Sequence, residues 1–152
     1  MSAVLQVIDV VREYRRGSET VRALDDVSLT VEGGEMVAVT GRSGSGKSTL
    51  INVAGGLDEI TAGQILVDGV PLAGRTQTEL SRLRRRSIGY VFQNLNLIGS
   101  LTAAENVALP LEFDGLKPSA ARTEADVALE RIGVSDLADR FPHEMSGGQQ
   151  QR

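Results

Sequence analysis

The sequence predicts an α/β domain whose strands lie mainly in its first half and whose helices lie mainly in its second half. Three observations support this prediction. A glycine-rich loop at residues 41–49 lies between a short apolar run and an apolar-faced helix. The apolar runs at residues 4–10 and 27–31 are short and separated by turn residues, which is typical of an antiparallel sheet. Beyond residue 102, helix start and stop signals dominate.

In the first half, we expect strands at residues 4–10 and 27–31 and a buried strand at residues 35–40, directly before the glycine-rich loop. The helix after the loop should end at Gly55-Gly56, because glycine breaks helices. Residues 63–68 are predicted to form another strand, followed by a turn at Asp68-Gly69.

The middle of the chain combines a helix with a strand. Residues 79–86 look helical, and their arginines suit a solvated helix end, where cations complement the helix dipole, better than a nucleic-acid patch. Residues 88–92 are apolar and are predicted to form a buried strand that runs into a loop at residues 93–97.

The second half carries clear helix boundaries. Thr102 and Glu105 form a capping box, so a helix should begin there. A longer helix is predicted for residues 118–132, with proline in its first turn and glycine directly after it. A short helix at residues 135–140, capped by its serine, should end before Pro142.

Composition limits the class of protein. The 152 residues suffice for one domain with a real core. A formal net charge of −4 argues against a broad nucleic-acid footprint, which would be basic, so no nucleic-acid partner is expected. The absence of cysteine excludes disulfides and thiolate metal sites. No apolar run is long enough to span a bilayer, and the N-terminus does not read as a secretion signal.

The glycine-rich loop is the strongest functional signal. It fits the pattern G-x-x-x-x-G-K-[ST] and consists of Gly41, Arg42, Ser43, Gly44, Ser45, Gly46, Lys47, Ser48 and Thr49. Glycines let the backbone bend around a polyphosphate, which then meets inward-pointing amides and the positive end of the helix. Lys47 supplies a mobile cation, and Ser48 offers a hydroxyl to Mg²⁺. A chance match is the alternative, but the flanking strand and helix favour nucleotide binding.

A second motif lies near the end of the chain and consists of Ser146, Gly147, Gly148 and Gln149. About a hundred residues separate it from the glycine-rich loop, and Gln93 lies between them. With these motifs, the sequence resembles the nucleotide-binding cassette of ABC transporters over its whole length. It departs from the usual pattern at Met145, where the family usually has leucine, and at Arg42, where it often has proline.

The resemblance implies roles for particular residues. Tyr14 matches the aromatic residue that stacks on adenine, although local packing at a strand end is the alternative. Gln93 matches the glutamine that reaches Mg²⁺ or the attacking water, with an ordinary polar loop residue as the alternative. The catalytic residues present would be Lys47 and Gln93, and the metal ligands Ser48 and Gln93. Residues 146–149 of a second copy would cap the bound ATP.

The resemblance also implies the architecture and the partners. Residues 1–93 would form an antiparallel β-subdomain with the phosphate-binding core, and residues 94–152 a helical subdomain. The parallel core sheet would be incomplete. The implied cofactors are ATP and Mg²⁺. The implied partners are a second cassette and an integral membrane permease, which places the protein on the cytoplasmic side, peripheral on the inner face of the cell membrane.

Residues around the predicted strand at 88–92 resemble those of one subgroup of the family. The run Arg85-Arg86-Ser87-Ile88-Gly89-Tyr90-Val91-Phe92-Gln93 and the later Glu105-Asn106-Val107 resemble cassettes of the lipoprotein-release and macrolide-exporter type. Those ATPases work with four-helix permeases. The substrate and the direction of transport would be set by the permease.

The 152-residue sequence does not contain the parts that the family uses for hydrolysis. A strand ending in Asp, a Glu that acts on water and a switch histidine would all follow the second motif, and His143 precedes it. We therefore expect an N-terminal fragment of a cassette, inactive alone, with apolar strand faces left uncovered. The alternatives are a nucleotide-binding module that never hydrolyses ATP and a soluble cassette ATPase without a permease. A GTPase is disfavoured, because no N-K-x-D sequence occurs.

Overall fold

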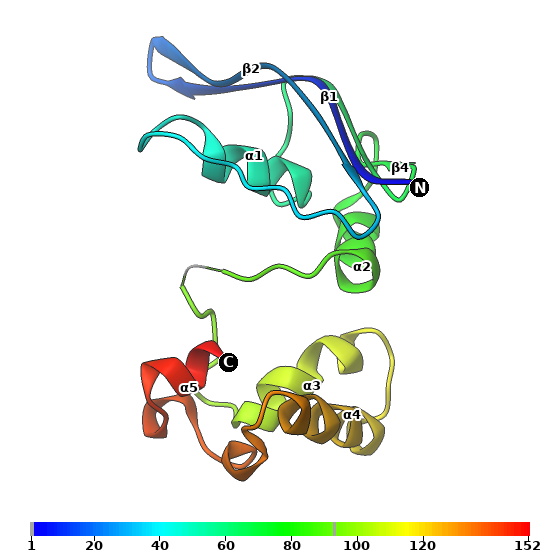
Figure 1. Ribbon diagram of the computed structural model, residues 1–152, viewed down its shortest axis with the longest axis vertical. Helices are drawn as coiled ribbons and strands as arrows, with labels where there is room; N and C mark the ends of the chain where they lie inside the picture. Colours follow the sequence, from blue (N-terminus) through cyan, green and yellow to red (C-terminus); the bar gives the residue numbers. More distant parts are fainter. Residues whose placement is uncertain (1, 93) are drawn as a thin grey trace. The chain divides into compact units, whose positions relative to one another are not determined.

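The computed structural model describes residues 2–92 and 94–152 (Figure 1). The chain forms two compact units, one from Met1 to Gly89 and the other from Tyr90 to Arg152. The first unit contains the sheet and two helices, and the second unit is helical.

The first unit is built on a four-stranded antiparallel sheet with the order β2-β1-β3-β4. Its strands are β1 (Ala3–Arg16), β2 (Glu19–Glu32), β3 (Ala62–Val67) and β4 (Val70–Pro71). The predicted strands at residues 4–10 and 27–31 are confirmed but are longer than expected. Tyr14 lies within β1, where it pairs with Val21 of β2.

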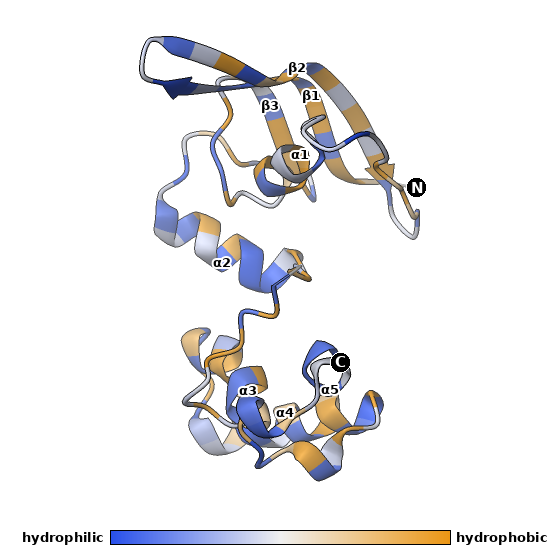
Figure 2. Ribbon diagram, turned by 90° about the vertical axis from the view of Figure 1, so that its left-hand side faces the viewer, coloured by the Kyte–Doolittle hydropathy of each residue, from blue (hydrophilic) through white to orange (hydrophobic). Residues whose placement is uncertain are grey.

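The helix α1 (Lys47–Ala54) packs on the sheet and forms a hydrophobic core with it. Its Leu50 and Val53 are buried with Val7, Val10, Leu24 and Ile65 of the sheet. Figure 2 shows the apolar residues of β1 and β3 beside α1. The helix ends at Gly55, as predicted, and Gly56 follows with φ of 63°. Packing against the sheet therefore fixes the segment that follows the glycine-rich loop.

The hairpin prediction for Asp68-Gly69 is confirmed. These two residues join β3 to β4, where Val67 pairs with Val70. Both have positive φ, 49° and 74°, as the favoured two-residue hairpin turn requires. The next element, α2 (Gln77–Ser87), confirms the predicted helix at residues 79–86 and begins in a capping box formed by Thr76 and Glu79.

Two predicted strands are wrong. Residues 35–40 and residues 88–92 have no strand structure, and no described strands pair in parallel. A buried parallel strand needs hydrogen-bonded neighbours and cover on both faces. Residues 35–40 pair with no described strand, and Met36, Val37 and Val39 are 96%, 44% and 41% exposed. The expected exposure of apolar residues in this run is therefore observed.

The second unit packs two long helices and several short ones. They are α3 (Ala103–Phe113), α4 (Pro118–Arg131), the 3₁₀ turns η1 (Ser135–Leu137) and η2 (Pro142–Glu144), and α5 (Gly147–Gln151). The buried residues Ala108, Ala121 and Ala125 form a cluster between α3 and α4, where their small side chains allow close approach. Gly133, with φ of 68°, follows α4 as predicted. The short helix expected at residues 135–140 is only a 3₁₀ turn, and Ser135 does not cap it.

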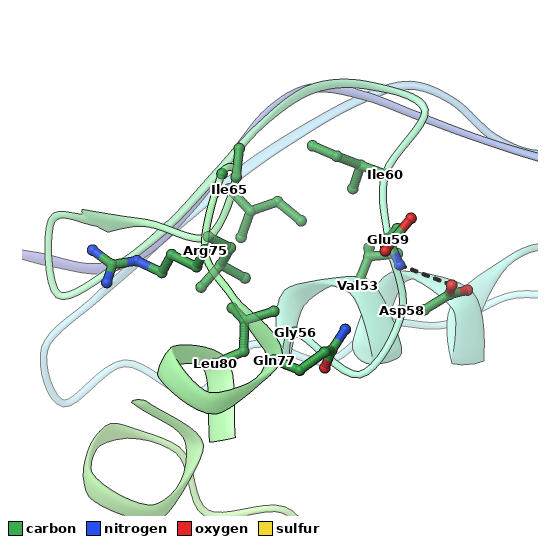
Figure 3. A pocket seen from close by; sticks show the side chains of 12 residues that line it. Val53, Gly56, Asp58, Glu59, Ile60, Ile65, Arg75, Gln77 and Leu80 are labelled. Carbon is green, nitrogen blue, oxygen red and sulfur yellow. Dashed lines mark hydrogen bonds between the residues drawn. The ribbon is translucent and has the colours of Figure 1, made fainter. Parts of the chain in front are cut away.

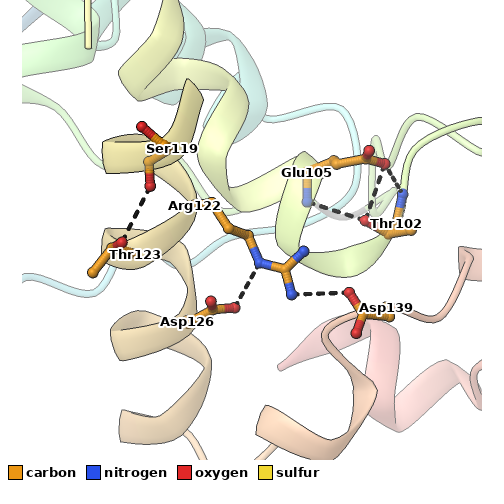
Figure 4. Close-up of polar contacts among 7 residues, drawn as sticks. All are labelled: Thr102, Glu105, Ser119, Arg122, Thr123, Asp126 and Asp139. Atoms are coloured by element: carbon orange, nitrogen blue, oxygen red, sulfur yellow. Dashed lines mark hydrogen bonds and ion pairs between the residues drawn. The ribbon is translucent and has the colours of Figure 1, made fainter. Parts of the chain in front are cut away.

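Polar contacts tie the second unit together (Figure 4). Arg122 donates from Nε to Asp126 and from Nη2 to Asp139, both at 2.9 Å, and so links α4 to the segment after η1. At the start of α3, Glu105 accepts hydrogen bonds from the Thr102 amide (2.7 Å) and hydroxyl (3.0 Å). These bonds lower the pKa of Glu105. The Thr102 hydroxyl in turn accepts from the Glu105 amide, so the predicted capping box is present.

Replacing Thr102 by alanine should destabilise the helical unit by about 1 kcal/mol, because the hydroxyl that accepts from the Glu105 amide is lost. Denaturant unfolding followed by circular dichroism measures this change. Thr123→Ala is the matched control, since the Thr123 hydroxyl only donates to the Ser119 carbonyl within α4 (3.1 Å). Equal destabilisation by both changes would contradict a special role for the cap.

Candidate functional site

The glycine-rich loop forms the wall of a hollow of about 480 Å³. The hollow lies between the loop, the first turn of α1 and one residue of β2. Its lining residues are Ala23, Ser43, Gly44, Gly46, Lys47, Ser48 and Thr49. The structure therefore brings most of the predicted loop residues together around one space, which is large enough for the phosphates of a nucleotide.

Glycine is required at two positions of this loop. Gly46 has φ of 88°, and a Cβ there would overlap the carbonyl oxygen of Ala23 on β2. Gly41 has φ of 154°, and its Cβ would lie 2.6 Å from the Ser45 hydroxyl. The loop thus bends back on itself, as the sequence pattern predicted for a loop that surrounds an anion, and it also approaches β2 closely.

The Lys47 ammonium group points back onto the loop. Its Nζ donates to the carbonyl oxygens of Gly41 (2.8 Å) and Arg42 (2.6 Å) and lies 3.5 Å from the Ser45 hydroxyl. Among the described residues, no carboxylate pairs with Lys47. The positive charge of Lys47 therefore lies at the wall of the hollow, and only neutral groups contact it. The Arg42 residue is exposed, and its carbonyl also accepts from the Ser45 amide (3.2 Å).

The first turn of α1 leaves its amides available. The N-cap residue Gly46 has no side chain to accept from them, and no acidic residue occurs in the first turn. By contrast, Thr76, Thr102 and Ser146 cap the starts of α2, α3 and α5 with their hydroxyls. Uncapped amides at a helix start attract anions, because they combine free donors with the positive end of the helix dipole. Ser48, in this turn, is exposed.

Tyr14 lies on β1 and makes two specific contacts. Its hydroxyl donates to Asp58 Oδ2 (2.6 Å), and the Arg12 guanidinium lies 4.4 Å from the ring centroid. Partial burial raises the pKa of Asp58, but hydrogen bonds from Tyr14 and the Glu59 amide, with the charge of Arg12, outweigh it and lower the pKa overall. Sequence reasoning missed Arg12 and Asp58, since they lie 46 positions apart and no local pattern signals their contact.

The second motif starts a helix in the other unit. The Ser146 hydroxyl accepts from the Gln149 amide (3.3 Å), and the Gln149 side-chain oxygen accepts from the Ser146 amide (2.8 Å). Gly147 and Gly148 are exposed, so their backbone is accessible. Met145, at the position that departs from the family pattern, packs against the buried cluster of Ala104 and Leu129.

The remaining residues singled out in the sequence are Gln93, His143 and the arginines of α2. Gln93 lies outside the described residues. His143 is exposed and lies in the 3₁₀ turn η2, with its ring stacked on that of Phe141 and the ring centroids 5.8 Å apart. Among the arginines of α2, Arg84 donates to the Gly56 carbonyl (2.5 Å) and to Ser81 (3.0 Å), so it fastens the helix to the turn after α1.

A further hollow of about 260 Å³ was not predicted (Figure 3). It lies between α1, β3 and α2 and includes Val53, Ile65 and Leu80 among its apolar lining residues. Asp58 lies at its rim, where it accepts from the Glu59 amide (2.8 Å).

In the described part of the chain, no helix has the length and apolar character needed to cross a membrane.

Comparison with known proteins shows what the chain is similar to. The sequence profile of the family "ABC transporter" matches residues 24–152. A macrolide export ATP-binding/permease protein, MacB of Psychrobacter cryohalolentis, is 42% identical over 149 residues, which are 98% of this chain and 22% of the relative. The methionine import ATP-binding protein MetN 1 of Rhodopseudomonas palustris is 47% identical over 149 residues, 96% of this chain and 40% of the relative.

A solved structure is also similar. A dimeric, post-hydrolysis state of the ATP-binding cassette MJ0796, bound to ADP and Pi, has a TM-score of 0.87 and 39% identity. The alignment covers 96% of this chain and 65% of that one. This similarity confirms the predicted α/β cassette fold. The chain spans about a fifth of the length of the macrolide-export relative and about two thirds of the solved cassette.

Proposed function

The chain belongs to the ABC transporter family, and on that basis we propose that it binds ATP and Mg²⁺ at residues 41–49 as the ATP-binding part of a membrane transporter. The observation that carries the proposal is the environment of Lys47. Its ammonium group contacts only loop carbonyls and one hydroxyl, beside the uncapped first turn of α1. Such a site attracts a polyphosphate, since the lysine and the free amides both favour negative charge.

The residues around the loop have distinct proposed roles. Lys47 exchanges the Gly41 and Arg42 carbonyls for the outer phosphates. Gly44, Gly46 and the first residues of α1 present backbone amides to the phosphates, together with Ser43, Ser45 and Thr49. The exposed Ser48 hydroxyl suits Mg²⁺, which takes oxygen ligands and keeps several waters. When bound, Mg²⁺ would supply charge neutralisation between the phosphates.

We propose that two further residues contact the nucleotide. Tyr14 stacks on the adenine ring, and its 38% exposure leaves surface for that contact. Gln93 reaches the metal or the attacking water through its side-chain amide. These assignments follow the resemblance of the residues to the family pattern.

We propose that the second motif acts on the ATP of a second copy. Ser146, Gly147, Gly148 and Gln149 would close over the γ-phosphate held by the partner's loop. The exposed glycine amides at the start of α5 support this role. The similar cassette MJ0796 was solved as a dimer. Closure would then depend on the γ-phosphate, and its loss would reopen the dimer, which makes the pair a ligand-biased switch.

The partner on the membrane is proposed to be an integral permease, with the cassette peripheral to it on the inner face of the cell membrane. The name of the macrolide-export relative combines an ATP-binding part with a permease. The sequence similarity to both an export and an import protein supports transport as the class of function. Export of the macrolide or lipoprotein-release type is our proposal, from the resemblance at residues 85–93.

The assignment of a β-subdomain with the phosphate-binding core and of a helical subdomain, divided near residue 93, belongs to the same proposal.

A polypeptide of these 152 residues should bind ATP but release no phosphate above background. Hydrolysis requires a group that orients the attacking water, and the family's glutamate for this task follows the second motif. Calorimetric titration with ATP and Mg²⁺, with a phosphate-release assay on the same sample, measures both properties. Turnover by this polypeptide would contradict the assignment of the catalytic parts, and absence of ATP binding would contradict the proposed function.

The second candidate function is a nucleotide-binding module that does not hydrolyse ATP in any context. Extension of the same chain beyond Arg152 distinguishes the two. Turnover that appears once an apolar strand ending in Asp-Glu is included supports the ATPase, and binding without turnover in the extended protein supports the module.

A further inference from the structure

The Tyr14 side chain is held from two directions, and we propose that Arg12 and Asp58 are positioning residues that fix its ring for stacking on a nucleobase. The inference rests on the proposed ATP binding and adds two residues to that site. Neither is part of the glycine-rich loop or of the second motif. They act through Tyr14 and need not touch the nucleotide themselves.

The first support is the clamp on the Tyr14 hydroxyl. It donates to Asp58 Oδ2 at 2.6 Å, while Asp58 Oδ1 accepts from Arg12 Nη2 at 2.6 Å. The same oxygen accepts from the Glu59 amide at 2.8 Å, a bond drawn in Figure 3. Hydrogen bonds to a carboxylate are short and strong, since one partner is charged. Both oxygens of Asp58 are therefore engaged, and the backbone of the turn after α1 anchors the carboxylate.

The second support is the cover on the Tyr14 ring. The Arg12 guanidinium lies over the ring, 4.4 Å from its centroid, and the Arg12 side chain is only 19% exposed. One face of the ring is thereby occupied by a cation, so a base can stack only on the other face. Fixing the ring before binding removes an ordering step that would otherwise weaken the complex.

The third support is the place of the clamp in the fold. Tyr14 pairs with Val21 on β2, and Ala23, two residues further along β2, lines the phosphate hollow. Strands rise roughly 3.3 Å per residue and lie about 4.8 Å apart, which puts the Tyr14 backbone within about 10 Å of that wall. Asp58 follows α1, whose first turn faces the hollow. The proposed phosphate site therefore lies at the first turn of α1, and the carboxylate that holds Tyr14 lies in the turn that follows the same helix.

The test separates base binding from phosphate binding. Calorimetric titrations with ATP and with inorganic tripolyphosphate, both with Mg²⁺, are made on the unaltered protein and on Asp58→Ala, Arg12→Gln and Tyr14→Ala. Tyr14→Ala should lower ATP affinity about tenfold or more, the range expected for loss of aromatic stacking on a base. Asp58→Ala and Arg12→Gln should lower it about three- to tenfold, with tripolyphosphate affinity within about twofold of the unaltered protein.

A double variant distinguishes positioning from a separate effect. Tyr14→Phe keeps the ring and removes the hydroxyl that Asp58 holds, so Asp58→Ala should lower ATP affinity less in that background than in the unaltered protein. The matched control is Asp25→Ala, since Asp25 is also paired with an arginine, Arg22, at 2.9 Å, but on the exposed surface. It should change neither affinity.

Three outcomes would overturn the inference. One is an equal loss of ATP and tripolyphosphate affinity in Asp58→Ala, which indicates general structural damage. Another is an unchanged ATP affinity in Asp58→Ala while Tyr14→Ala lowers it. Failure of the unaltered protein to bind either ligand would overturn the proposed function and this inference with it, and so is distinguishable from the first two.

Discussion

Replacing Lys47 by alanine should lower ATP affinity by roughly a hundredfold or more, because several charge-assisted hydrogen bonds to the phosphates are lost together. The reason lies in the environment of the ammonium group. It bonds only to the Gly41 and Arg42 carbonyls (2.8 and 2.6 Å) and lies 3.5 Å from one hydroxyl. Those neutral partners leave its positive charge available to an anion.

Calorimetric titration with ATP and Mg²⁺ measures this loss. The other lysine of the chain, Lys117, provides a matched control, since it lies at the start of α4 in the second unit. Lys117→Ala should bind ATP as the unaltered protein does. An unchanged affinity in Lys47→Ala would refute the assignment of the glycine-rich loop as the phosphate site.

Replacing Ser146 by arginine should abolish ATP-dependent dimerisation while the isolated protomer still binds ATP. Ser146 begins α5 next to two exposed glycines, the surface proposed to meet the partner's γ-phosphate. A long side chain there would prevent close approach of the glycine amides. The glycine-rich loop lies in the other unit of the same chain, so its own affinity should stay within about twofold.

Analytical ultracentrifugation with and without ATP and Mg²⁺ measures the change in association. Ser135→Arg is the control, because Ser135 is an exposed serine of the same unit that caps no helix. It should dimerise normally. A Ser146→Arg protein that still dimerised with ATP would contradict the head-to-tail arrangement.

Features set by neighbouring residues could be predicted from the sequence. The capping box of Thr102 and Glu105 and the turn at Asp68-Gly69 lie where expected, because each depends on a few adjacent residues. The glycine-rich loop belongs to the same group. Its backbone geometry requires glycine for a local reason at Gly41, where a Cβ would lie 2.6 Å from the Ser45 hydroxyl.

Features that depend on distant partners could not be predicted. Residues 35–40 have the composition of a buried strand, but a strand forms only where another strand accepts its hydrogen bonds. The extension of β1 to Arg16 was missed because its polar residues hide a pairing with β2. The contact between Asp58 and Tyr14 joins residues 44 positions apart, and no local pattern signals it.

A crystal structure of the protein grown with ATP and Mg²⁺ would show whether residues 41–49 hold the phosphates. We expect the triphosphate in the hollow between residues 41–49 and α1, with Lys47 Nζ moved from the Gly41 and Arg42 carbonyls to the phosphates. A triphosphate bound elsewhere, with Lys47 still on those carbonyls, would contradict this expectation.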